Sequence, residues 1–206
     1  MKHSTFLITL LLGLFLFGCG QAGSKNSSSQ SDTIVDSNGD KEQIGNLVKQ
    51  VLKWHEKNGV LAGFEPIFIP NDSLVQGMDL TILKPELKKL TESKLFDKEF
   101  VDNYESIVLK IDKKIKSKEI QWLEGDMPPY AGADPWCNCQ DIPYDDPWDK
   151  IEIKFQSIDK ENATLTWTWG NSDWSKDFNY KVKAKKTDGV WKISYLQGFD
   201  INEFVR

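Results

Sequence analysis

Residues 178–195 read FNYKVKAKKTDGVWKISY, and this stretch decides the fold class. Apolar and polar residues alternate on both sides of Asp188-Gly189, which is the period of a β-strand with one buried face. An Asp-Gly pair between two alternating runs is a strong hairpin signal, because both residues tolerate the positive φ angles of a tight turn. The stretch therefore predicts two antiparallel strands joined by a short turn.

The same period of two is present upstream, in the runs from Ile151 to Phe155 and from Leu165 to Trp169. We therefore expect a run of antiparallel strands with one apolar face. Trp167, Trp169 and Trp191 belong to that face. A tryptophan stripe most often packs in a core, because each indole buries a large area, and a stacked platform for sugars or other flat ligands is the alternative.

Helical spacing precedes the strands. Asp40 and Gln43 have the spacing of a capping box, and the apolar run after them ends at Asn58-Gly59. A shorter helix is expected over Lys84–Glu92, with Pro85 in its first turn. A long stripe from Phe100 to Ile115 predicts a third helix. Helices followed by antiparallel strands predict an α+β fold, with the N-terminal helices packed on a curved antiparallel sheet.

A 26-residue loop, Glu124–Asp149, separates the helices from the strands and holds five of the eight prolines and seven acidic residues. We expect a lid packed on the sheet, with Trp136 and Trp148 as apolar anchors. With Asp141, these two residues form a candidate binding loop. A calcium site is the alternative for the acids, but the alternation and central glycine of an EF-hand are missing. The sequence predicts no metal site and no cofactor.

Cys137 and Cys139 flank a single asparagine in this loop. A disulfide between them, two reduced packing thiols, a metal site and a redox pair are all compatible with the spacing. A metal site would need further nitrogen or sulfur ligands, which the sequence does not supply nearby. A redox pair usually has Cys-x-x-Cys spacing at a helix N-terminus, which is missing here. The disulfide is favoured, because an oxidising compartment is expected for this chain.

Histidine is scarce, and His55 is the only one outside the first few residues. Nucleophilic catalysis needs a histidine beside a nucleophile and an orienting acid, and no motif supplies either. We expect His55 to be a surface or half-buried polar group near a helix end. No catalytic residue is predicted.

The N-terminus indicates export. Lys2 precedes an apolar run from Phe6 to Phe17, which has the length of a signal-peptide core and is too short to span a bilayer. Leu16-Phe17-Gly18-Cys19 resembles the lipobox of bacterial lipoproteins, in which the cysteine thiol receives a diacylglycerol. Gly20, where an aspartate would resemble an inner-membrane retention signal, favours the outer membrane of the bacterial cell envelope.

The predicted organisation therefore has three parts. Residues 1–18 form the signal peptide, residues 19–40 form a lipidated, flexible tether rich in serine, glycine and asparagine, and residues 41–206 form a single domain. The formal net charge of the chain is −5. We expect no footprint for nucleic acid or for anionic lipid on a net negative domain.

Three segments carry a resemblance to a known family: Leu52-Lys53-Trp54-His55, the stretch Asp134–Asp141 and the closing strand Gly189–Ile193. With the order of helices and strands, they make the region Glu42–Leu196 similar to the nuclear-transport-factor-2-like cone superfamily. Within it, the chain resembles a bacterial lipoprotein family of unknown function, the YbjP/YqhG type. The resemblance implies a cone fold and an envelope location, and it implies no reaction.

These observations favour a membrane-anchored envelope lipoprotein that acts as a non-catalytic binding or accessory subunit for another envelope protein. One alternative is an immunity or inhibitor protein against a secreted toxin. Another is an isomerase, dehydratase or hydrolase with its site inside the cone, which would need an acid or base facing that cavity.

Overall fold

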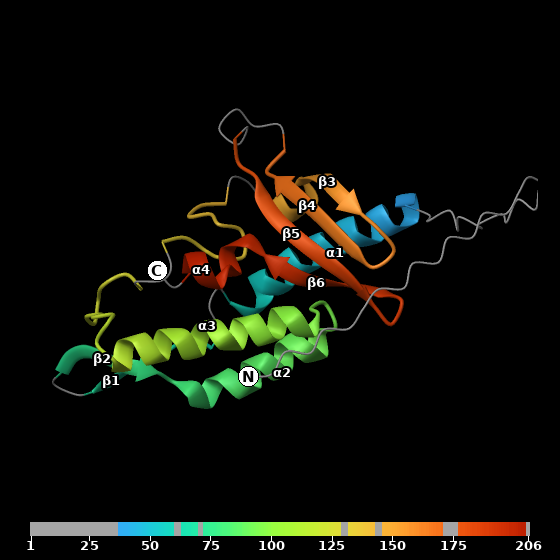
Figure 1. The fold of residues 1–206 in the computed structure, drawn as a ribbon. Helices are drawn as coiled ribbons and strands as arrows, with labels where there is room; N and C mark the ends of the chain where they lie inside the picture. Colours follow the sequence, from blue (N-terminus) through green and yellow to red (C-terminus); the bar gives the residue numbers. More distant parts are fainter. Residues whose placement is uncertain are drawn as a thin grey trace, which may run out of the picture. The chain divides into compact units, whose positions relative to one another are not determined.

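The C-terminal half of the chain forms one four-stranded antiparallel sheet in the computed structural model (Figure 1). Its strands pair in chain order: β3 (Glu152–Ile158), β4 (Asn162–Thr168), β5 (Tyr180–Thr187) and β6 (Val190–Leu196). Asp188 and Gly189 turn between β5 and β6 with φ angles of 53° and 77°. The alternating runs therefore predicted these strands and the hairpin correctly. The structure describes residues 37–59, 63–69, 72–128, 132–142, 146–170 and 177–204.

One face of the sheet is filled with buried side chains, which include Leu165, Tyr180, Val182 and Ile193. Trp167, Trp169 and Trp191 lie on this face and are 0–3% exposed. The tryptophan stripe is therefore part of the core, and the alternative of an accessible aromatic platform is wrong. The opposite face carries polar residues, since side chains alternate along each strand.

The main helices are α1 (Ser37–Asn58), α2 (Leu80–Ser93) and α3 (Lys98–Lys116). Both α1 and α3 contact β6, and α2 packs on α3. The stripe predicted for the third helix is buried as expected. Helices and antiparallel sheets make the protein α+β, as the sequence predicted.

Two helix starts differ from the prediction. Helix α1 begins at Ser37, so Asp40 is a helical residue and not its cap. Its carboxylate instead accepts hydrogen bonds from Lys186 Nζ and Trp191 Nε1, each at 2.8 Å, which tie α1 to the β5–β6 hairpin. Helix α2 begins at Leu80 because Asp79 caps it through the backbone N–H of Thr81. Pro85 consequently lies inside the helix.

A second, two-stranded sheet was not predicted. Strand β1 (Pro66–Ile69) pairs with β2 (Asp72–Met78) through an irregular register with two shifts, which erases the clear alternation of a strand. On its other side, β2 bonds to the segment Trp122–Glu124, and β2 also contacts α3. This hairpin region exposes a set of large apolar side chains, namely Ile67, Phe68, Ile69, Leu74, Leu123 and Met127.

The predicted signal peptide, Cys19 and the tether up to residue 36 lie outside the described residues. In the part of the chain that the structure describes, no helix combines the length and apolar character needed to cross a bilayer.

Candidate binding pocket

A pocket of about 600 Å³ opens where the loop around Pro135 meets the ends of β5 and β6. Its other wall is the C-terminal segment, in which the 3-10 turn η3 (Gln197–Phe199) leads into the short helix α4 (Ile201–Phe204). The volume lies within the usual range of small-ligand sites. Its polar lining side chains come from separate parts of the chain: Asn138, Lys181, Tyr195, Gln197, Asp200 and Glu203.

The Tyr180 hydroxyl holds two walls of the pocket together. It donates a hydrogen bond to the carbonyl of Pro135 at 2.6 Å and accepts one from the backbone N–H of Gly198 at 3.0 Å. Burial raises the pKa of Tyr180 well above its ordinary value, so the hydroxyl keeps the proton that it donates. A Cβ atom on Gly198 would collide with the backbone of Pro135, so only glycine permits this approach.

His55 fixes the base of the same loop. Its Nε2 atom lies 2.8 Å from Asp134 Oδ2, and its Nδ1 atom lies 3.3 Å from the carbonyl oxygen of Gly59. The other carboxylate oxygen of Asp134 accepts the backbone N–H of Trp136 at 2.9 Å. His55 is buried, so the expected surface or half-buried placement is wrong: the Asp134 carboxylate supplies the partner that lets a polar ring enter the core.

Cys137 and Cys139 are joined by a disulfide across a Cα–Cα distance of 5.1 Å. Asn138 between them has a φ of 51°, a left-handed conformation that asparagine tolerates better than most residues, and its side chain lines the pocket. The backbone N–H of Asp134 donates to the carbonyl of Cys139 at 2.9 Å and closes the loop. The disulfide and this bond present Asn138 on a short, closed loop.

Trp136 anchors the loop in the core. Its ring stacks on His55 with 5.1 Å between centroids and contacts Phe100 and Phe199 edge-on or tilted. The indole is 2% exposed, so it cannot touch a ligand without rearrangement. The loop is anchored here on the helices and η3, whereas the sequence predicted anchoring on strand aromatics.

The other two members of the predicted binding loop lie elsewhere. Trp148, in the 3-10 turn η1 (Pro147–Asp149), is buried against Trp169 and donates its Nε1 hydrogen to Glu56 at 3.2 Å. Trp148 therefore packs on an aromatic that directly follows β4, close to the packing on strand aromatics that the sequence predicted. Asp141 is exposed and does not line the pocket. Among the residues that the structure describes, no three His, Cys, Asp or Glu side chains form a group that could hold a metal.

Tyr195 and Asp200 form the polar centre of the pocket. The Tyr195 hydroxyl donates to Asp200 Oδ2 at 3.1 Å. Burial, followed by this bond, raises the pKa of Tyr195 to about 12. A hydrogen bond from the backbone N–H of Asn202 is the main reason why the pKa of Asp200 is lowered. At neutral pH the pair is therefore a phenol that donates and a carboxylate that accepts.

Lys181 and Gln197 form the adjoining side. The backbone N–H of Lys181 donates to Gln197 Oε1 at 2.8 Å, and the ammonium group of Lys183 lies 5.1 Å from the centre of the Tyr195 ring. The pocket thus presents cationic, anionic and neutral hydrogen-bonding groups. The Tyr180 hydrogen bonds and the disulfide hold the backbone around it in place. This lining suits recognition of a polar ligand, and no serine, cysteine or histidine nucleophile is among the described residues that line it.

The sequence did not identify Tyr195, Asp200 or Lys181 as site residues. Tyr195 and Lys181 look like ordinary strand positions, and Asp200 looks like an ordinary helix cap. Tyr195 and Lys181 come together because antiparallel pairing puts Tyr195 opposite Lys183, two residues along β5 from Lys181. Asp200 joins them because η3, which precedes it, lies beside β5. The local signal that the chain turns after the last strand was the single glycine Gly198.

No family model, no curated protein and no solved structure matches this chain. The resemblance to an envelope lipoprotein family therefore stays a prediction from the sequence.

Proposed function

We propose that this protein is a lipid-anchored subunit of the bacterial cell envelope that binds a polar segment of a protein partner without catalysis. The observation that carries the proposal is the polar pocket around Tyr195 and Asp200, whose surrounding backbone is held in place by the hydrogen bonds of Tyr180. A site that is held in place before binding loses less conformational entropy when a ligand occupies it, so this rigidity favours ligand binding. The raised pKa of Tyr195 keeps its hydroxyl protonated at neutral pH, so the group can donate a hydrogen bond but cannot accept a proton, which supports binding over proton abstraction.

The β1–β2 hairpin supports a protein as the partner. Its region exposes Phe68 at 42% and Met127 at 71%, together with neighbouring isoleucines and leucines. Exposed apolar residues that are grouped in one region of a surface are typical of protein interaction sites. The anchor at Cys19 and the outer-membrane location remain part of this proposal, on the strength of the lipobox spacing.

A cone-pocket enzyme is the second candidate, and the cone arrangement itself remains a proposal. It is favoured by the order of helices followed by four antiparallel strands. The filled inner face counts against an active site between the sheet and the helices, because side chains such as Trp167 and Phe199 occupy that space. The pocket at Tyr195 lies at the end of β6 and belongs to the binding proposal.

In-cell photo-crosslinking tests the binding function on the full chain. A photoreactive amino acid at Asn138, an exposed residue on the pocket rim, should crosslink to one dominant envelope protein that mass spectrometry can identify. The same amino acid at Lys57, an exposed residue of α1 that does not line the pocket, serves as the control.

Tyr195→Phe removes one hydroxyl and keeps the ring, so it should reduce the Asn138 crosslink while leaving the amount of protein unchanged. Equal crosslinks from Asn138 and Lys57, or a product that is insensitive to Tyr195→Phe, would contradict the proposal. Substrate turnover that depends on Tyr195 or Asp200 would favour the enzyme instead.

A further inference from the structure

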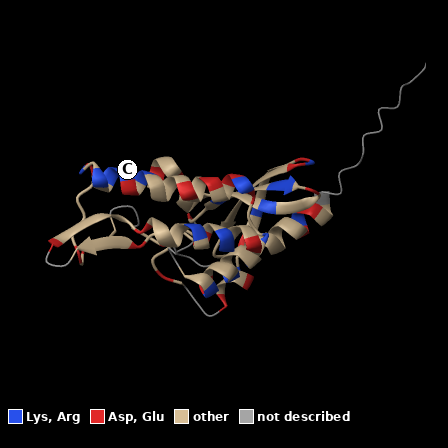
Figure 2. Ribbon diagram, turned by 90° about the horizontal axis from the view of Figure 1, so that it is seen from below, with Lys and Arg blue, Asp and Glu red and all other residues tan. Residues whose placement is uncertain are grey.

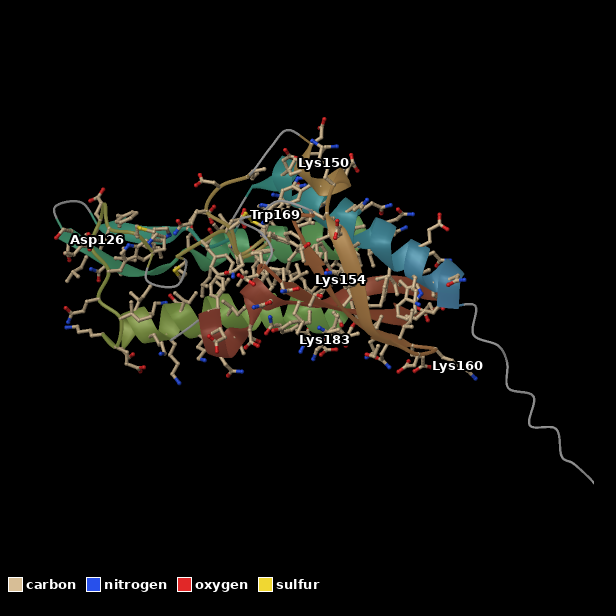
Figure 3. The ribbon with its side chains drawn as sticks, turned by 90° about the horizontal axis from the view of Figure 1, so that it is seen from above. Asp126, Lys150, Lys154, Lys160, Trp169 and Lys183 are labelled. Atoms are coloured by element: carbon tan, nitrogen blue, oxygen red, sulfur yellow. A yellow bond between two sulfur atoms is a disulfide. The ribbon has the colours of Figure 1, made fainter. Side chains whose placement is uncertain are left out.

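The outer face of the four-stranded sheet is rich in lysine, although the chain as a whole carries a formal charge of −5. Lys181, Lys183 and Lys185 alternate along β5 and are exposed. Successive side chains on one face of a strand are about 7 Å apart, so these three form a row. Lys154 on β3 and Lys192 on β6 flank the row, and we call these five residues the lysine face. Figure 2 colours the lysines and arginines of the ribbon blue, and Figure 3 labels Lys154 and Lys183.

Strand register brings the lysine face together. Lys154 pairs with Thr166, which pairs with Lys181 on the next strand. Lys185 lies directly opposite Lys192. Like charges at opposite positions destabilise a sheet, so this arrangement gives the isolated domain no benefit. An anionic surface placed over the lysine face would convert that repulsion into attraction.

Among the described residues, no carboxylate forms an ion pair with the lysine face, although the ammonium group of Lys183 lies over the Tyr195 ring. By contrast, Lys186 on β5 is paired with Asp40. Burial acts to raise the pKa of Asp97, but hydrogen bonds from the Glu99 N–H and the Thr187 hydroxyl lower it, followed by the charges of Lys185 and Lys192. Its carboxylate already caps α3 and accepts the Thr187 hydroxyl at 2.8 Å.

The position of α1 orients this face. The carboxylate of Asp40, in the first turn of α1, bonds to Lys186 and Trp191, which are the chain neighbours of Lys185 and Lys192. The start of α1 therefore lies at the β5–β6 turn end of the sheet, next to Lys185 and Lys192 of the lysine face. About 18 residues separate Ser37 from Cys19, which is a reach of at most about 60 Å.

We infer that the lysine face docks on anionic lipid headgroups of the membrane to which the chain is anchored. This inference rests on the proposed anchor at Cys19, which would hold the domain within one tether length of the bilayer. Each lysine near an anionic membrane raises the affinity about fivefold, and a tether raises the local concentration, so five lysines suffice without apolar insertion. The domain would then lie with α1 and α3 turned away from the headgroups.

Lysine acylation on membranes tests the inference. The full chain, isolated from membranes, is reconstituted into vesicles of phosphatidylcholine alone or of phosphatidylcholine with phosphatidylglycerol, and the acylation of each lysine is measured by mass spectrometry. Acylation of the lysine face should be several-fold slower on the anionic vesicles. Lys57, Lys84 and Lys113, exposed on α1, α2 and α3, should react equally on both. Raising the salt to about 1 M should remove the protection, because the screening length then falls to about 3 Å.

A matched pair of variants identifies the charges. The triple variant Lys154→Gln, Lys185→Gln and Lys192→Gln should lose the protection of Lys181 and Lys183, and the triple variant Lys57→Gln, Lys84→Gln and Lys113→Gln should keep it. None of these six residues lines the pocket, so the crosslink at Asn138 tests the proposed pocket independently of the lysine face. Vesicle flotation shows independently whether the lipid anchor holds the chain on the vesicles. Uniform acylation on both vesicles overturns the inference. Protection by soluble polyphosphate without protection by vesicles also overturns it, and would point to an anionic polymer.

Discussion

The Nε2 atom of His55 lies 2.8 Å from a carboxylate oxygen of Asp134, and 79 positions of chain separate the two residues. One belongs to α1 and the other begins the disulfide loop that walls the pocket. His55 is buried, and the Asp134 side chain is only 19% exposed, so this largely shielded bond joins the helical layer to the pocket rim. The loop position thus depends on a contact that no local pattern announces.

His55→Ala should lower the free energy of unfolding by about 2–4 kcal/mol. The change removes the partner of Asp134 and the ring that stacks on Trp136. Denaturant unfolding measures the loss, with Lys57→Ala on the exposed side of the same helix as the control. A loss below about 0.5 kcal/mol would mean that the bond does not hold the loop.

Gly198→Ala should destabilise the fold by about 1–3 kcal/mol, because its Cβ would displace the backbone of Pro135 and break the Tyr180 clamp. Gly132→Ala is the matched control: Gly132 also lines the pocket, but a Cβ there meets nothing within 4 Å. Thermal or denaturant melts compare the two variants. Equal stability of both would show that Pro135 and η3 can separate without cost.

Acid should weaken the contact between α1 and the hairpin. The Lys186 ammonium, followed by Trp191, holds the pKa of Asp40 below its ordinary value of 3.8. A lowered folded pKa contributes stability that is complete above about pH 4 and is lost as the pH falls through the folded value. Asp40→Asn should therefore cost about 1–2 kcal/mol at pH 7, and the difference from the parent should shrink below about pH 4.

Unfolding of the parent and of Asp40→Asn, measured between pH 7 and about pH 2.5, checks this sign. Lys57→Ala provides a variant in which no buried hydrogen bond changes. A difference that stays constant down to the lowest pH would mean that Asp40 does not titrate with the fold.

Cys137 and Cys139 should be oxidised in protein isolated without reductant. Because Cys137 is buried, the alkylating reagent must act on the unfolded chain, and intact-mass analysis should then show neither residue alkylated. After reduction, both should be modified. Two alkylated cysteines before reduction would restore the interpretation as packing thiols.

Cys19→Ser should leave the chain uncleaved or release it from the membrane, because the serine hydroxyl does not receive the diacylglycerol. Fractionation and intact mass of the full-length variant measure both effects. Normal processing together with continued partition into detergent would contradict the proposed anchor.

The sequence determined the elements whose signal is local. Alternation around Asp188-Gly189 predicted the hairpin, and the stripe from Phe100 to Ile115 predicted α3, because one buried face imposes a period on the residues that form it. The two helix starts were predicted less well, since Asp40 has a capping residue's chemistry but a tertiary partner. The bulged β1–β2 hairpin was missed because its irregular register leaves no period to detect.

The tertiary structure alone decided which residues meet. The partnership of His55 with Asp134, the Tyr180 clamp and the pocket all join segments that are distant in sequence. The net charge of the chain predicted no contact with anionic lipid, but strand register places five lysines on one face. The net charge is a single sum over the sequence and does not say where the charges lie. The fold distributes the same charges over different surfaces, and a binding partner contacts one of these surfaces.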